Sequence, residues 1–578
     1  MTLRDRGLIA ALSVVLVALT IASLAPSLEG TREVGAQPST LPVARPYTEG
    51  VLGHATNASP FGARSPADRD LVALIYRGLV RLGPGNAIVP DLASRWEVDP
   101  TGADWTFHLR SGLTWQDGQP LTADDVVFTV QTLSDASYDG PGAASWRDVT
   151  ATAVDPLTVT LQLATPLGGF LVAATQPIAP AHLLAGIAPA DLPNDAFGRH
   201  PVGSGPFRLA SLNASGAILE PASGVDVLPG DGGGPTFRTP PPTDSLGSSP
   251  PTTPPRDPVP YLSGIEFLYY DDVASLRAAW ADGLLDAASG LPPADAMALG
   301  SGPGARLVRY PGSTLLAVEL NLRRAHPEFR DPAVRRALLA AIDRDAIVAS
   351  VLDGLAKRAD TLIPPSSDFF NASLSKPIAS GAATARAALI AAGWKRSGTS
   401  WIPKGAKKPL LVEVLSPDSS VNPIAFAVAT DVVASWRAIG LDARAVALPV
   451  TLSLADRLRT GVFQAAVVPL VIGLDPDLYP LLASSQTRTG GANVSGLQDQ
   501  ALDKVLTAAR APTSDAGRQA AYSALQKALS AGTFMLPIAF RDEVVVLRDT
   551  VSGPVARPIV TSGDRFWDVL TWRLAVGR

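Results

Sequence analysis

The stretch from Trp105 to Phe128, WTFHLRSGLTWQDGQPLTADDVVF, contains three aspartates and one histidine. Carboxylates and imidazoles act as general acids and bases and bind metal ions, so the stretch is a candidate active site or metal site. Each aspartate also has a structural explanation. Asp117 precedes a glycine and suits a tight turn. Asp124 and Asp125 follow Thr122 at the start of a predicted helix, where they favour the helix dipole and complete a capping box. We therefore predict that this stretch is a scaffold.

Other motifs that could carry enzymatic or metal chemistry are weak. Ser373 and Lys376 match the Ser-x-x-Lys motif of penicillin-binding enzymes, but the companion Lys-Thr-Gly motif is missing. The chain has no cysteine, which excludes disulfides, thiol catalysis and cysteine metal sites. The histidines are scattered without paired ligand spacing: His54, His108, His182, His200 and His326. We predict that the protein is not an enzyme and holds no metal or cofactor. A secreted hydrolase is the alternative class.

Strand and helix patterns alternate along the chain. Trp105, Phe107 and Leu109 alternate with polar residues, which predicts a half-buried strand. The segment DPLTVTLQL, residues 155–163, has the same period of two. Asp331 and Pro332 suit the N-cap and the first position of a helix that continues with apolar residues at helical spacing. The alternation predicts an α/β fold.

The composition and the N-terminus limit the partners and the location. The chain has 578 residues and a net charge of −5, so we expect several folded units and no nucleic-acid partner. Arg4 and Arg6 precede an uncharged, mostly apolar run from Gly7 to Ala25. We favour an uncleaved membrane anchor, with a cleaved signal peptide as the alternative. Both interpretations place the bulk of the protein outside the cytoplasm (cell surface or periplasm), and the absence of cysteine excludes a lipoprotein.

Residues 222–260 are dense in proline, glycine, serine and threonine and have almost no large apolar side chain. Such a segment cannot bury enough apolar surface to offset the loss of chain entropy on folding. We therefore predict a disordered insertion here.

The order of residues in WTFHLRSGLTWQDGQPLTADDVVFTV resembles the signature of the bacterial extracellular solute-binding proteins of family 5. That family includes oligopeptide-, dipeptide- and nickel-binding proteins of ABC importers. Further segments resemble the family in the same order: NASPFGARSPADRDLVALIYRGLVRL, HPVGSGPFRLAS, STLLAVELNLRRAHPEFRDPAVRRALLAAIDRDAIV, GLDPDLYPLL and FMLPIAFRDEVVVL. The resemblance covers roughly residues 47 to 570, interrupted by the predicted insertion.

The resemblance implies a two-lobed periplasmic-binding-protein fold of type II, large subclass, with a third, small domain. It also implies that a peptide-like or other small polar ligand is enclosed between the lobes. Because the ligand contacts both lobes only in the closed state, binding shifts the population toward closure. The closed form, which we expect to be monomeric, would then be delivered to the permease subunits of an ABC importer. A receptor or sensor without a transporter is the alternative.

The proportions of the family predict the domain ranges. They are 1–45 for a signal or anchor and a flexible leader, 46–82 for the first part of lobe I, 83–198 for the small domain, 199–315 for the second part of lobe I with the insertion, 316–540 for lobe II, and 541–578 for the return segment of lobe I.

The sequence departs from the peptide-binding members of the family at one position. In those members an aspartate lies four residues before the proline of the present Asp475-Pro476-Asp477 motif and pairs with the α-ammonium group of the peptide. Here that position is Ile472, which cannot neutralise a buried ammonium group. Asp475 or Asp477 could take over this role if the loop is reshaped. Otherwise the ligand is not an ordinary free peptide, and a sugar, a modified or cyclic peptide, an opine-like compound or a chelate are alternatives.

The candidate ligand-binding residues follow from their positions in the predicted elements. They are Asn57, Ser59 and Phe61 after the first predicted strand, Asn321 at the end of the strand VELN, and Asp475, Asp477 and Tyr479 on the loop just described. For each, the structural alternative is a turn or hinge residue that packs near the cleft. Trp394 and Trp401 could stack on a ligand, although packing in a core or hairpin is the favoured alternative.

Overall fold

The computed structural model describes residues 45–222, 262–449, 453–488 and 491–575. The predicted N-terminal anchor and nearly all of the predicted insertion lie outside these residues. Within them, no helix is long and apolar enough to cross a membrane. Residues 44–578 form one compact unit.

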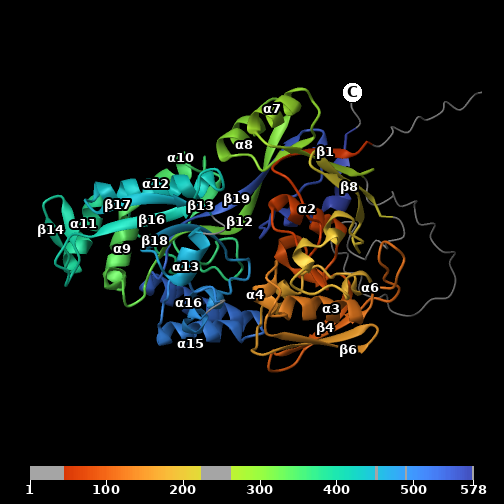
Figure 1. Cartoon of the computed structure of the whole chain (residues 1–578), viewed down its shortest axis with the longest axis horizontal. Helices are drawn as coiled ribbons and strands as arrows, with labels where there is room; N and C mark the ends of the chain where they lie inside the picture. Colours follow the sequence, from red (N-terminus) through yellow and green to blue (C-terminus); the bar gives the residue numbers. More distant parts are fainter. Residues whose placement is uncertain (1–44, 223–261, 450–452, 489–490, 576–578) are drawn as a thin grey trace, which may run out of the picture. The chain divides into compact units, whose positions relative to one another are not determined.

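The strands and helices of the described chain alternate, as the sequence predicts (Figure 1). The strands are β1 Tyr47–Leu52, β2 Val80–Leu82, β3 Ile88–Pro90, β4 Ala93–Val98, β5 Asp104–Leu109, β6 Val149–Asp155, β7 Thr158–Leu163, β8 Phe207–Asn213, β9 Gly216–Pro221, β10 Ile265–Tyr270, β11 Ala287–Ser289, β12 Ala305–Leu320, β13 Ala356–Arg358, β14 Lys395–Ser397, β15 Ser400–Ile402, β16 Leu411–Pro417, β17 Asp442–Leu448, β18 Ala465–Val471, β19 Leu536–Arg548, β20 Val551–Ser552 and β21 Arg573–Leu574. The helices are α2 Pro66–Ile75, α3 Ala123–Ser134, α4 Ala143–Trp146, α5 Phe170–Ala173, α6 Ala181–Leu184, α7 Val273–Ala281, α8 Pro293–Gly300, α9 Pro332–Ala341, α10 Arg344–Ser350, α11 Ala382–Ala391, α12 Pro423–Ala438, α13 Ala455–Thr460, α14 Tyr479–Leu482, α15 Gln500–Arg510 and α16 Asp515–Gly532.

The stretch that opens the sequence argument forms part of a separate four-stranded sheet of order β4-β5-β7-β6. Trp105, Phe107 and Leu109 of β5 are buried, so the predicted alternation is confirmed. The predicted capping box is also confirmed. The amide of Thr122 donates to Oδ2 of Asp125 at 2.9 Å, and helix α3 begins directly after this threonine. The aspartates of the stretch therefore position backbone, as expected for a scaffold.

The large sheet has the order β17-β16-β18-β12-β19-β11-β1-β10-β9-β8, with β13 also paired to β19. Strands β12 and β19 are antiparallel neighbours along most of their lengths, from Ala305 opposite Arg548 to Val318 opposite Leu536. The register of this pair shifts twice, between Leu316 and Ala317 and, nearer the first core, between Tyr310 and Thr314. Beyond that shift β12 also pairs with β18, from Thr314 opposite Val471 to Leu320 opposite Ala465.

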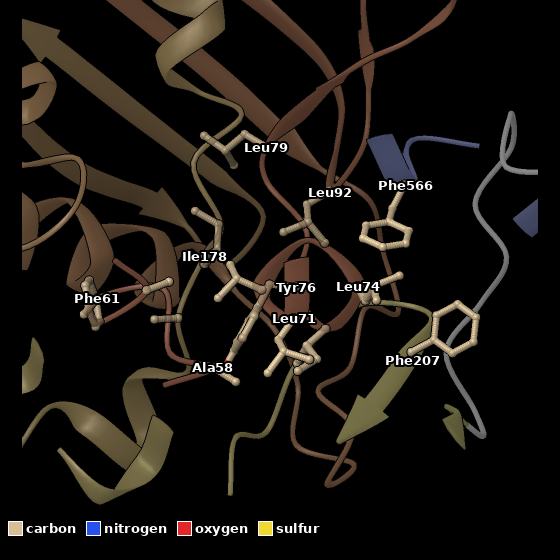
Figure 2. Close-up of a cluster of buried hydrophobic side chains, with 14 of the residues drawn as sticks. Ala58, Phe61, Leu71, Leu74, Tyr76, Leu79, Leu92, Ile178, Phe207 and Phe566 are labelled. Atoms are coloured by element: carbon tan, nitrogen blue, oxygen red, sulfur yellow. The ribbon is translucent and has the colours of Figure 1, made fainter. Parts of the chain in front are cut away.

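Two main hydrophobic cores divide these long strands between them. The first core contains buried side chains of residues 47–310 and 545–572, including Tyr310 of β12 and Val545 of β19; Figure 2 shows part of it. The second core contains buried side chains of residues 315–540, beginning with Leu315 of β12 and ending with Phe540 of β19. Trp394 and Trp401 belong to this second core. The predicted domain ranges themselves stay a prediction.

A buried ionic cluster ties the end of the chain to the first core. Arg565 contacts Oε1 of Glu49 on β1 at 2.6 Å and Oδ2 of Asp70 on α2 at 2.8 Å, and all three side chains are buried. Tyr47 donates its hydroxyl to the second oxygen of Glu49 at 2.8 Å. Arg565 pairs with two buried carboxylates at once. The C-terminal segment is therefore joined to the first core by ion pairs as well as by hydrophobic packing.

Glu319 is a buried carboxyl group in the part of β12 that belongs to the second core. It lies opposite Ala466 of β18 and is 3% exposed. Among the described residues, its Oε2 atom has no hydrogen-bond partner. Burial raises the pKa of Glu319 from its usual 4.5 to about 8, since a low-dielectric environment disfavours the charged form. The folded protein therefore holds this group protonated at neutral pH, whereas the unfolded chain ionises it.

Replacing Glu319 with glutamine is expected to raise the free energy of unfolding at pH 8 relative to wild type. Between pH 4.5 and pH 8 the folded state retains a proton that the unfolded state has lost, so wild-type stability falls as the pH rises. We expect this contribution to differ by about 3 kcal/mol between pH 5 and pH 8, and the Glu319→Gln variant to lack it. Urea unfolding at both pH values measures the difference. The control is Glu220→Gln at an exposed position on β9, and equal pH profiles for wild type and Glu319→Gln would contradict the assignment.

Candidate ligand-binding site

The parallel strands of the second core end at one edge of the sheet, beside the point where β12 leaves the first core. Strands β16, β17 and β18 run in the same direction, and Val471 at the end of β18 lies opposite Thr314. The amide of Ile472 donates to the carbonyl of Ser313 at 3.2 Å. In open α/β sheets, ligands bind outside the carboxyl ends of the strands, at the point where the topology switches. This edge and the loop 472–479 that follows β18 are therefore the candidate site.

The two aspartates of this loop are bonded to side chains of the neighbouring helices α15 and α16. Asp475 forms an ion pair with Arg518, and the hydroxyl of Tyr522 donates to its other oxygen at 2.9 Å. Asp477 lies 3.2 Å from Nε of Arg510. Both carboxylates therefore already have a cationic partner within the protein.

Aromatic rings surround these ion pairs. The guanidinium of Arg510 lies 4.7 Å from the ring centre of Tyr479, and that of Arg518 lies 4.2 Å from the ring centre of Phe369. The rings of Phe369 and Tyr522 stack at 4.7 Å. Cations over aromatic faces are held by attraction to the ring quadrupole, so the two arginines are fixed from two sides.

Burial raises the pKa values of two groups around the loop, Asp477 and Tyr522. It raises the pKa of Asp477, although the charge of Arg510 opposes the shift. It also raises the pKa of Tyr522, and the neighbouring Asp475 carboxylate adds to the effect. At neutral pH Tyr522 is therefore a fixed hydroxyl donor to Asp475.

The rest of this edge presents neutral and apolar groups. Ile472 is buried in the second core, so it supplies neither a carboxylate nor an open surface. Val471, the last residue of β18, and Val421, in the segment after β16, are both more than half exposed. Asp418, directly after β16, accepts hydrogen bonds from the amide and hydroxyl of Ser420, and these bonds lower its pKa. Among the described residues, Asp418 has no ion-pair partner.

The candidates after β1 form a separate group whose polar atoms bond to one another and to backbone. Asn57 donates its side-chain amide to the carbonyl of Pro193 at 2.9 Å and accepts the amide of Ser59 at 2.8 Å. The hydroxyl of Ser59 accepts the amide of Phe61 at 3.2 Å. Phe61 is fully buried in the first core (Figure 2), where its ring lies against Tyr138 at 5.8 Å. These three residues lie together and shape a turn, and their contact with ligand stays a prediction.

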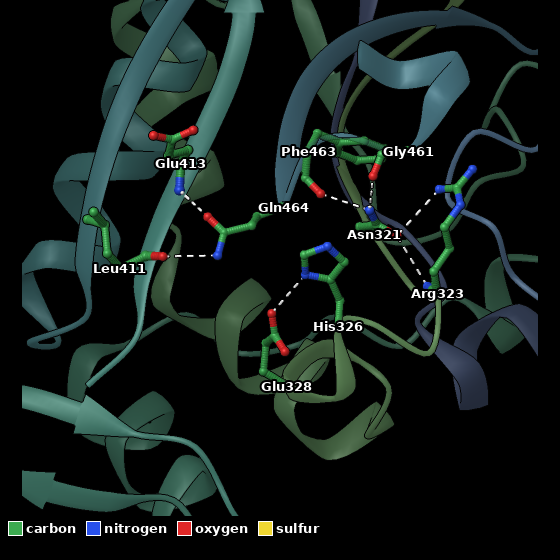
Figure 3. Close-up of polar contacts among 9 residues, drawn as sticks. All are labelled: Asn321, Arg323, His326, Glu328, Leu411, Glu413, Gly461, Phe463 and Gln464. Carbon is green, nitrogen blue, oxygen red and sulfur yellow. Dashed lines mark hydrogen bonds and ion pairs between the residues drawn. The ribbon is translucent and has the colours of Figure 1, made fainter. Parts of the chain in front are cut away.

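Asn321 directly follows β12, at the end of this strand that belongs to the second core. Its side-chain amide donates to the carbonyls of Gly461 and Phe463, each at 2.8 Å, and its oxygen accepts the amide of Arg323 (Figure 3). The side chain is fully buried. In this arrangement Asn321 joins β12 to the turn before β18, while its contact with ligand stays a prediction.

Comparison with known proteins decides the family. The model of the bacterial extracellular solute-binding proteins, family 5 Middle, matches residues 87–492. The chain belongs to this family. Protein XP55 of Streptomyces lividans is 27% identical over 511 residues, which cover 87% of this chain and 85% of that protein.

Solved structures share the fold of this family 5 protein at low sequence identity. The oligopeptide-binding protein AppA from Bacillus subtilis, in complex with a nonapeptide, has a TM-score of 0.72 at 19% identity and covers 92% of this chain and 100% of its own. NikZ from Campylobacter jejuni, in complex with Ni(L-His), has a TM-score of 0.71 at 20% identity, and the match covers 91% of this chain and 99% of NikZ. The two-lobed, type II periplasmic-binding-protein fold is confirmed. The two bound ligands differ so much that the fold alone does not fix the ligand.

Family membership also gives the general function. The protein is an extracellular solute-binding protein that captures a ligand and delivers it to an ABC importer. The relatives are binding proteins of transporters and not enzymes. Hereafter, lobe II is the part built on the second core. Lobe I and the small domain share the first core, and the small domain is the part that contains the sheet β4-β5-β7-β6.

Sequence reasoning predicted the loop of this family 5 protein as a candidate site but missed the two arginines that pair with its aspartates. Arg510 and Arg518 lie on helices that begin more than 20 residues after the loop. Nothing in their local sequence distinguishes them from other surface arginines. The pairing is a tertiary contact, and only the packing of α15 and α16 beside the loop creates it.

Replacing Arg518 with methionine is expected to lower the free energy of unfolding by about 3 kcal/mol, because Asp475, whose side chain is only 10% exposed, then keeps an unneutralised charge. The double variant Arg518→Met/Asp475→Asn should recover part of this loss, since both charges are then removed. Urea unfolding of the four proteins in the cycle measures the coupling. The control is Arg459→Met in the exposed pair with Asp456, where we expect less than about 0.5 kcal/mol. A loss for Arg518→Met as small as that of the control would show that the pair is not buried in solution.

Proposed function

We propose that the solute carried by this protein has no free ammonium group held by the loop 472–479. The observation that carries the proposal is that both acidic side chains of the loop already have an arginine partner, Arg518 for Asp475 and Arg510 for Asp477. A ligand ammonium would have to displace a guanidinium that is also held over an aromatic ring. Leaving that guanidinium buried without its carboxylate is costly.

The surroundings of the loop support the same conclusion. The family position for an ammonium partner holds Ile472, which is buried. The exposed groups at this edge include the apolar side chains of Val421 and Val471. Such a surface favours a solute that presents neutral or apolar groups to lobe II and is oriented by hydrogen bonds. A blocked or cyclic peptide, a sugar, an opine-like compound or a chelate fits this description.

The protein should purify with a ligand that lacks a reactive amine. Native mass spectrometry of the full-length protein isolates the complex, and treatment of the released ligand with acetic anhydride adds one acetyl group for each free amine. We expect no added acetyl group. A ligand that gains one at its α-amino group, such as a linear peptide, would overturn the proposal unless the Asp418 variant described below shows that the amine is held outside the loop.

A matched pair of variants locates the cation site if such an amine is found. Asp418→Asn is the test variant, because among the described residues Asp418 has no ion-pair partner. Asp442→Asn is the control, because it removes an exposed carboxylate at the start of β17, the end of this strand remote from the candidate site. Loss of an amine-containing ligand in Asp418→Asn alone would assign its recognition to Asp418 instead of the loop.

We further infer that the protein acts as a monomer outside the cytoplasm and is held at the membrane by residues 7–25. The basis is the apolar run after Arg4 and Arg6, which is long enough to span a bilayer. The intact mass of the protein from membranes tests this anchor. A mature chain that begins at Gln37 would mean that the run is a cleaved signal peptide.

A further inference from the structure

Two turns of the small domain lie directly against the turn between α15 and α16 of lobe II. The first docking turn is 99–102 and the second is 166–169. The amide of Gly168 donates to the carbonyl of Arg510, the last residue of α15, at 2.7 Å. A Cβ atom built on Gly102 would lie 3.0 Å from Cγ2 of Thr513. The small domain therefore contacts lobe II from both turns.

The second docking turn has no room for side chains at two positions. A Cβ atom on Gly168 would overlap the carbonyl oxygen of Pro512, and one on Gly169 would overlap Oδ2 of Asp475. Gly169 has φ −88° and ψ 10°, and Gly168 does not have a positive φ either. Both conformations are open to any residue, so glycine is needed here for close approach and not for backbone freedom.

Trp105 fixes both docking turns to the first core. Its indole N–H donates to the carbonyl of Gly102 at 3.3 Å. Its ring packs at 5.7 Å from Phe170, the first residue of α5, which directly follows Gly169. Phe170 is itself fully buried. Trp105 therefore holds the two docking turns at a fixed distance from each other.

We propose that the small domain is a second clamp on lobe II, and that Gly168 and Gly169 are positioning residues for the loop 472–479. Docking brings the second turn against the Asp475–Arg518 ion pair, with the Gly169 Cβ position 3.0 Å from a terminal nitrogen of Arg518. Contact with the pair restricts the loop that carries it. The clamp acts through this ion pair and does not depend on the identity of the solute.

Spin-label distances between the small domain and lobe II test the docking. The chain has no cysteine, so Val154→Cys on β6 and Thr507→Cys on α15, both at exposed positions, create two unique labelling sites. Double electron–electron resonance on the full-length protein gives the distance distribution. In the otherwise wild-type background we expect one narrow distribution.

Adding Gly169→Ala should shift the ratio of docked to undocked protein by about tenfold or more toward the undocked state, because the new methyl group has no space. The distribution should then broaden or acquire a second, longer distance. Gly186→Ala is the matched control, since a Cβ atom there meets nothing within 4 Å. It should leave the distribution unchanged.

Thr513→Trp tests the same contact from lobe II. Thr513 is exposed, and its Cγ2 atom lies 3.0 Å from the position of a Cβ atom on Gly102, so a larger side chain obstructs the first docking turn without disturbing either core. It should broaden the distribution as Gly169→Ala does. Identical distributions in wild type, Gly169→Ala and Thr513→Trp would overturn the proposal, and this outcome is independent of which ligand the protein carries.

Discussion

The antiparallel pairing of β12 and β19 is the constraint on which the two-lobed structure depends. Both strands begin in one core and end in the other, so a single ladder of backbone hydrogen bonds is shared by both lobes. The ladder is irregular between Tyr310 and Thr314 and again between Leu316 and Ala317. Only the first irregularity lies between the two cores, so we expect hinge motion to be absorbed there. The amide of Ile559 in the return segment bonds to the carbonyl of Pro311 at 3.0 Å inside this interval.

The candidate site lies beside the same interval of β12, between Tyr310 and Thr314. Because β18 pairs with β12 from Thr314 onward, the loop after β18 starts beside the hinge and extends over α15 and α16. Its two aspartates are neutralised within lobe II itself. If the proposed function holds, a solute bound here would meet hydrogen-bonding groups, aromatic rings and apolar side chains, without an unpaired acidic group on the loop. Its selection would then depend on shape and hydrogen bonds more than on net charge.

Sequence patterns predicted those features whose partners lie close in the chain. The β5 strand follows from alternation, and the Thr122–Asp125 cap joins residues three positions apart. The helix that Asp331 caps is likewise local. The candidate loop was also predicted, because the family-like segments occur in a fixed order along the chain and this order can be read from the sequence. Its electrostatics could not be predicted, since Asp475 and Arg518 are 43 residues apart and meet only after α16 has packed.

The polar candidates Asn57 and Asn321 illustrate the same limit. Their residue type and position suit ligand contact, but their amides donate to carbonyls 136 and 140 residues away, at Pro193 and Gly461. A buried amide needs partners wherever it lies, and backbone carbonyls satisfy it as well as a ligand does. Only the folded chain decides between these partners.

The stretch that begins at Trp105 is thus explained by structural contacts of its side chains. Its aspartates hold a turn and a helix start, and His108 lies on the polar face of β5. Its tryptophan contacts both docking turns, through a hydrogen bond to Gly102 and through packing on Phe170. A rigid aromatic side chain can fix two backbone segments at once because it buries a large surface with few rotatable bonds. The residues that look catalytic by type are therefore explained by the backbone they hold, while Trp105 fixes the two turns that face lobe II.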